Sequence, residues 1–128
     1  MDIDALAAAY LTRDHDRFNW EPENELSRML SEDPDAAWSF TEAAIEASRT
    51  VGDLGTVGVG PLEEIMRRYG ASFADDLVDR VRADARWAYA ASMVRRAAGA
   101  EDAQAAVKAQ WPDWMQLDAA ATARLAQP

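Results

Sequence analysis

The chain has 128 residues, 49% of them hydrophobic, and its 23 acidic and 13 basic side chains give a formal net charge of −10. This length supports a single domain with an ordinary core, and the lack of cysteine excludes disulfides, thiolate nucleophiles and cysteine metal sites. No segment approaches the roughly 18 apolar residues of a membrane span, and the acidic start does not resemble a secretory signal. We therefore expect a cytoplasmic bacterial protein with no membrane partner. Its negative charge disfavours direct binding to nucleic acid.

Three helices are predicted in the first part of the chain. The first covers about residues 2–13, the second covers about 22–31, and the polar run 12–19 between them is expected to form a loop or frayed turn. Asp33 is a good N-cap for the third helix because Pro34 follows at the first helical position. Apolar and small residues then recur at spacings of three and four, which predicts one buried stripe made of Ala37, Trp38, Thr41, Ala44, Ile45 and Ser48.

Glycine dominates the next segment, residues 51–60. Because glycine costs about 1 kcal/mol relative to alanine inside a helix, this segment is predicted to be a connection or a weak single turn. Pro61 then begins a helix, and Gly70 is predicted to end it with a left-handed C-cap. Ser72 is predicted to cap the helix that follows.

The last third of the chain also follows a helical pattern. A helix is expected to bend near Asp84, and its apolar stripe is expected to continue to Ala98. A further helix covers about residues 101–111 and is broken by Pro112. The remainder forms either a short helix or a poorly docked tail. Since no strand pattern is found, the sequence predicts an all-α fold, with residues 1–128 forming a single compact bundle of about six or seven short helices.

The chain is similar to a known family in two segments, DPDAAWSF (33–40) and GVGPLEEIMRRYGASFADDLVDRVRADARW (58–87). They resemble an uncharacterised bacterial family, a domain of unknown function, in which an Asp-Pro/Ala-Trp helix precedes a Gly-Pro-Leu-Glu helix. The resemblance covers about residues 20–97, so that 99–128 would be a C-terminal extension. It implies a compact helical fold and no established activity, and it supplies no catalytic residues.

The glycine-rich segment is not a convincing phosphate loop. It lacks the lysine of such loops, and Glu63 and Glu64 would place negative charge at the helix end that must receive phosphate. The single histidine, His15, lies between two aspartates, but a catalytic zinc normally takes three protein ligands. We therefore interpret His15 as part of a solvated loop, with a metal, base or pH-sensing role as the alternative.

Pairs of acids at helical spacing, Glu42 with Glu46 and Asp75 with Asp79, lie opposite the apolar stripes and are expected to be solvated. The sequence therefore predicts no catalytic residue, no cofactor and no metal ligand, although enzymatic activity stays an open question. The chain contains five tryptophans, and the predicted buried stripes do not account for all of them. Those near helix ends are candidates for partner contact or gap filling, and four arginines are further candidates for partner contact: Arg67, Arg68, Arg95 and Arg96.

The leading hypothesis is a non-enzymatic, acidic protein-binding module whose partner has a basic surface. It would act as an immunity or inhibitor protein against a basic toxin or nuclease, since concentrated acidity attracts such partners. The predicted partner-binding residues are Trp20, Glu21, Glu23, Glu25, Glu42, Glu46, Trp111 and Trp114. The alternative is a small-molecule-binding or enzymatic helical domain with a pocket lined by tryptophan and carboxylates. A self-associating structural module is the third possibility, and the sequence does not give the oligomeric state.

Overall fold

A computed structural model describes residues 2–12 and 20–127 of the chain. In these residues the helices are α1 (Ile3–Leu11), α2 (Glu21–Glu32), α3 (Pro34–Ala47), α4 (Val51–Val57), α5 (Glu63–Ala83), α6 (Ala85–Ser92), α7 (Glu101–Gln110) and α8 (Trp114–Leu125). A π-helical segment, η1 (Gly58–Leu62), joins α4 to α5 across a kink at Gly60, whose backbone angles (φ −104°, ψ −106°) are not helical. A 3₁₀ turn, η2 (Ala98–Ala100), precedes α7. With α4, η1 and α5 taken as one kinked helix, the described residues form seven helices and no strand. The predicted all-α class and helix number are confirmed.

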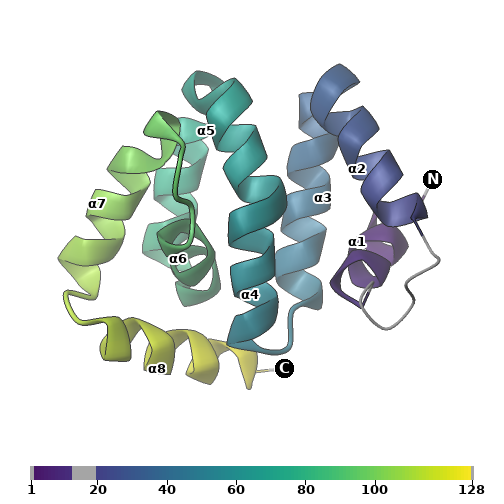
Figure 1. The fold of residues 1–128 in the computed structure, drawn as a ribbon. Helices are drawn as coiled ribbons and strands as arrows, with labels where there is room; N and C mark the ends of the chain where they lie inside the picture. The colour runs from purple at the N-terminus through teal and green to yellow at the C-terminus, as the bar shows by residue number, and fades with distance from the viewer. Residues whose placement is uncertain (1, 13–19, 128) are drawn as a thin grey trace.

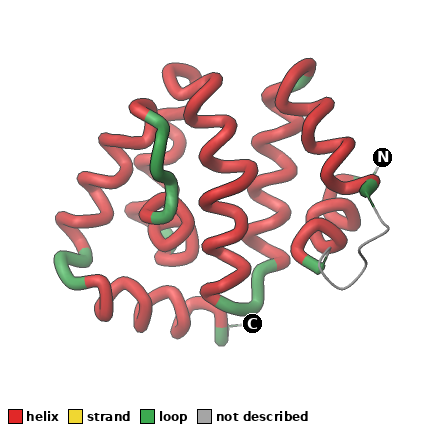
Figure 2. The backbone as a smooth tube through the Cα atoms, in the orientation of Figure 1, coloured by secondary structure: helices red, strands yellow, loops and turns green. Residues whose placement is uncertain are grey.

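The helices pack around one hydrophobic core (Figure 1). Helices α1 and α2 pack on α3, and the kinked segment α4–η1–α5 lies between this group and α7. Helix α8 crosses the end of the bundle and packs against α6. Figure 2 shows that short loops join the helices and that the chain runs as a loop between α6 and η2. None of the described helices is long and apolar enough to cross a membrane.

The predictions for the first three helices hold for the described residues. Asp33 caps α3 by accepting a hydrogen bond at Oδ1 from the Ala36 backbone N–H (3.1 Å), and Pro34 occupies the first turn. All six members of the predicted stripe on α3 are buried, together with Phe40. Because caps and apolar stripes are set by residues within one or two turns, they can be predicted from sequence. Most of the predicted loop at 12–19 lies outside the described residues.

The glycine-rich segment is helical except at Gly60, so its prediction as a connection or a weak single turn was wrong. Thr50 caps α4 by accepting a hydrogen bond at Oγ1 from the Asp53 N–H (3.1 Å). Gly58 then lies directly against α6, where a Cβ atom would overlap the Ala90 carbonyl oxygen and come within 2.9 Å of Met93 Cβ. The glycine therefore permits close packing between helices, and this packing offsets its low helix propensity.

The prediction of a left-handed C-cap at Gly70 was also wrong. No described glycine has a positive φ, and the helical geometry breaks at Tyr69 (φ −131°, ψ 26°), where α5 is kinked rather than ended. Ser72 consequently lies inside α5 instead of capping a new helix. Gly70 faces the backbone of Gly99, and a Cβ atom on Gly70 would lie 2.8 Å from the Gly99 Cα atom. The two glycines let α5 and η2 touch through their backbones.

The bend near Asp84 and the break at Pro112 are confirmed, but α6 ends at Ser92 and does not continue to Ala98. The Gln104 side chain explains this end, since its Nε2 donates hydrogen bonds to the carbonyl oxygens of Ala91 (3.1 Å) and Val94 (2.7 Å). Of the two possibilities for the C-terminal segment, the structure shows the short helix, which buries Leu117 and Ala121.

The close approach at Gly58 leads to a stability prediction. Replacing Gly58 by alanine should lower the free energy of unfolding by about 1–3 kcal/mol, because the new methyl group overlaps the α6 backbone. The matched control is Gly52→Ala in α4, where the nearest atom lies 3.5 Å from the added Cβ and a gain of about 0.5–1 kcal/mol is expected. Denaturant unfolding measures both. Equal effects at the two positions would contradict the packing interpretation.

Candidate functional site

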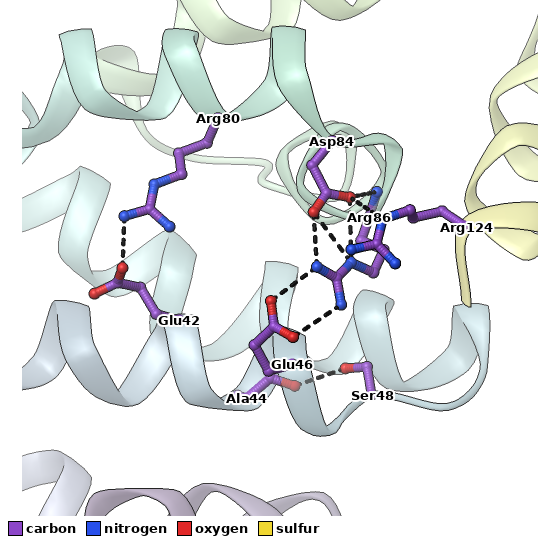
Figure 3. A network of polar contacts seen from close by, with 8 residues as sticks. All are labelled: Glu42, Ala44, Glu46, Ser48, Arg80, Asp84, Arg86 and Arg124. Atoms are coloured by element: carbon purple, nitrogen blue, oxygen red, sulfur yellow. Dashed lines mark hydrogen bonds and ion pairs between the residues drawn. The ribbon is translucent and has the colours of Figure 1, made fainter. Parts of the chain in front are cut away.

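A network of charged side chains joins α3, α6 and α8 (Figure 3). Its centre is Arg86, which is only 6% exposed. The Arg86 guanidinium donates to Asp84 (Nη2 to Oδ2, 2.7 Å) and to Glu46 on α3 (Nη2 to Oε1, 2.8 Å). Asp84 also lies 3.8 Å from Nε of Arg124 near the end of α8. Two arginines and two carboxylates therefore balance in charge, and they connect three helices.

The electrostatics of this network follow from its burial and its hydrogen bonds. Burial of Asp84 acts to raise its pKa. This effect is smaller than the combined lowering by hydrogen bonds from the Arg86 side chain and backbone and by the charges of Arg86 and Arg124. The pKa of Asp84 therefore lies below its usual range. The hydrogen bond to Asp84 is the main cause that raises the pKa of Arg86, against the opposing effect of burial. Both groups stay charged at neutral pH.

A second arginine, Arg80 of α5, lies over the aromatic part of the core. Its guanidinium carbon is 5.0 Å from the centre of the Trp87 ring, and its Nη2 donates to Glu42 Oε2 at 2.5 Å. Arg80 also pairs with Asp76, one turn earlier on α5, with Nε 3.3 Å from Oδ1. Beneath this arginine, Trp38 lies between Phe73 and Trp87, with ring centres 4.8 and 5.4 Å away.

Glu42 and Glu46 line one shallow depression of about 530 Å³, together with Asp4, Ser39, Arg80 and Trp87. Each of the two glutamates is bound to an arginine, and these pairs join α3 to α5 and α6. Asp75 is not among the lining residues. Within residues 2–12 and 20–127, no three His, Cys, Asp or Glu side chains are grouped as a metal site would need. His15 lies outside the described residues.

The second hollow is an apolar groove between α7 and α8, with a volume of about 540 Å³. Trp111 and Trp114, two of the predicted partner-binding residues, both line it, with Val107, Pro112 and Leu117. This groove, which we call the α7–α8 groove, is defined by those residues together with Ser92, Gln104, Ala105 and Lys108. A volume of this size is typical of sites that accept a small ligand or several side chains of a partner.

The groove forms because the chain turns sharply between the two helices. Pro112 ends the α7 pattern, and Asp113 caps α8 by accepting a hydrogen bond at Oδ1 from the Met115 N–H (2.8 Å). Leu117 then anchors α8 on the core, while the Trp114 ring contacts Tyr89 of α6 with ring centres 5.1 Å apart. Despite this contact Trp114 is 51% exposed, and the neighbouring Met115 is 76% exposed.

The remaining predicted residues lie at the start of α2, on the opposite side of the molecule in Figure 1 from the α7–α8 groove. Trp20 is 60% exposed there. Glu21 and Glu23 lie in the first turn, where a negative charge favours the helix, and Glu25 Oε2 accepts a hydrogen bond from Arg28 Nε at 3.1 Å. The structure thus divides the eight predicted residues among three places. Glu42 and Glu46 line the depression on α3, Trp111 and Trp114 line the α7–α8 groove, and Glu21 and Glu25 line a further hollow between α1 and α2.

The four predicted arginines are exposed side chains. Arg67 and Arg68 both pair with Glu64, at N···O distances of 2.6 and 3.1 Å. The Arg95 backbone N–H donates to Glu63 Oε1 (2.7 Å), which ties the loop after α6 to α5. Arg86 is not among the predicted site residues, because its only signal in the sequence is a charge directly beside Trp87 on an apolar helix.

The chain belongs to a family of unknown function, DUF6869, whose model matches residues 9–115. This finding confirms the resemblance drawn from the sequence, and the match reaches beyond residues 20–97 through α7 to the start of α8. No curated protein and no solved structure matches the chain.

The pKa of Asp84 leads to a prediction about acid stability. Since this pKa is lowered in the folded state, the network stabilises the fold above the unfolded value of about 3.9 and loses this effect as the pH falls through the folded pKa. Asp84→Asn should therefore lower stability at pH 7 and reduce its decrease on acidification, because asparagine keeps the cap on α6 but not the charge.

The matched control is Asp75→Asn, an exposed aspartate of α5 that has no ion pair with another described residue. Urea unfolding between about pH 3 and pH 7 measures both variants. If Asp84→Asn and Asp75→Asn change the pH dependence equally, the assigned role of Asp84 is wrong.

Proposed function

We propose that this protein is a binding module for another protein that carries a basic surface. The observation that carries the proposal is the pair of neighbouring side chains Trp114 and Met115, which are 51% and 76% exposed beside the α7–α8 groove. Tryptophan and methionine are enriched in protein interfaces, where a few such residues supply most of the binding free energy. Exposing them to water costs free energy that a partner would recover.

The charge of the chain indicates the kind of partner. A net charge of −10 attracts basic proteins over a distance and repels acidic ones, and it makes association faster at low salt. Acids at the start of α2, including Glu21, Glu23 and Glu25, contribute to this field whatever contacts they make within the chain. In its finer form the proposal is an immunity or inhibitor protein that acts in the bacterial cytoplasm against a basic toxin or nuclease.

The alternative of a small-molecule-binding or enzymatic domain has weaker support. Trp87, Glu42 and Glu46 do line one depression, as that hypothesis requires. Both glutamates are, however, bound to arginines that connect helices, so a substrate would have to compete with contacts of the fold itself. A protein partner at the exposed groove requires no such competition.

Affinity capture from the native host tests the proposal. We expect the chain to retain one stoichiometric protein of high isoelectric point at low salt and to release it at about 1 M salt, where the Debye length is ~3 Å. Light scattering on the purified mixture then gives the stoichiometry. Failure to retain any stoichiometric protein at low salt, or retention of an acidic protein that salt does not release, contradicts the proposal.

A further inference from the structure

The α7–α8 groove is mainly apolar, with one charged lining residue on α7 and a carboxylate beside it on α8. Lys108, the only lysine of the chain, lines the α7 side. On α8, Asp118 follows Trp114 by four residues, so the two side chains lie on one face of the helix. The Trp114 ring contacts Tyr89. The pKa of Tyr89 is raised mainly by burial and, to a smaller extent, by the nearby negative charge of Asp118.

Neither Lys108 nor Asp118 forms an ion pair with another described residue. By contrast, Arg80 and Arg86, which lie near the core, are each bound to a carboxylate. The charges beside the groove therefore differ from those of the helix-joining network, because they do not serve to connect helices. The two sides of the groove therefore differ in charge, with Lys108 lining the α7 side and Asp118 beside the groove on α8.

We propose that the α7–α8 groove binds an amphipathic helix of the partner. Its apolar face enters between Trp111 and Trp114, and a lysine or arginine beside that face lies against Asp118 and the exposed Trp114 ring. Helices commonly bind in this way, with apolar residues of one face in a groove and charges at its rim, and a cation over an indole ring adds to the attraction. This inference rests on the proposed function and specifies the place and the shape of the contact.

Two synthetic helices test the site on the full chain. They share the same leucine face, and one carries lysine and the other glutamate at the flanking positions. Each is titrated into ¹⁵N-labelled protein while the indole N–H signals of the five tryptophans are followed, with assignment by Trp→Phe variants. We expect the lysine helix to shift the Trp111 and Trp114 signals to saturation, and the glutamate helix to bind at least about tenfold more weakly.

Charge variants at Lys108, which lines the groove, and at Asp118, which lies beside it on α8, sharpen the test. Asp118→Asn should weaken binding of the lysine helix about two- to fivefold, and Lys108→Gln should strengthen it by a similar factor, as expected for single charges at a partly exposed rim. Both side chains reach solvent and neither joins helices, so the variants should keep the melting temperature of the parent. Asp75→Asn removes one negative charge from α5 and should leave the affinity unchanged.

The outcomes separate this inference from the proposed function. Equal binding of both helices, binding of neither, or a shift of the Trp20 signal alone would overturn the groove as the site. Capture of a basic host protein would then still support the proposed function, with its contact elsewhere. Conversely, selective binding of the lysine helix at Trp111 and Trp114 supports the groove even if host capture fails, and that failure counts only against the proposed function.

Discussion

The packing of this small bundle depends on one buried guanidinium. Arg86 is inserted among apolar residues of α6 and can be accommodated only because Asp84 and Glu46 accept its hydrogen bonds. A buried charge is costly unless it is paired, so α3 must lie where Glu46 can reach α6. Asp84 extends the same constraint to α8 through Arg124. One interaction thereby fixes the relative positions of three helices that are far apart in the sequence (Figure 3).

Close backbone contacts also determine how the helices pack against one another. Gly58 lies against α6, and Gly70 lies against Gly99, in each case nearer than a side chain would allow. These contacts place α5 beside η2 and α7, and the Gln104 amide donates to the Ala91 and Val94 carbonyl groups where α6 ends. The sharp turn of the chain at Pro112 then leaves the groove between α7 and α8.

The acidic residues of the chain occupy two kinds of position. On α3, Glu42 and Glu46 are neutralised by arginines and hold helices together. At the start of α2 and along α8, acidic residues lie near exposed tryptophans, Trp20 and Trp114. A count of charges cannot distinguish these positions. Only the tertiary structure shows that Glu42 and Glu46 meet arginines of other helices.

The sequence by itself determined the helical class, the cap at Asp33, the bend near Asp84 and the stripe on α3, because each depends on residues within a turn or two of one another. It also identified Trp111 and Trp114 as residues near a helix break. Only the tertiary structure decided that the glycine-rich segment is helical, that Arg86 is the buried centre of a network, and that the two tryptophans line one groove. These features depend on contacts between segments that are far apart in the sequence, and the spacing of residues along the chain does not indicate which segments will be in contact.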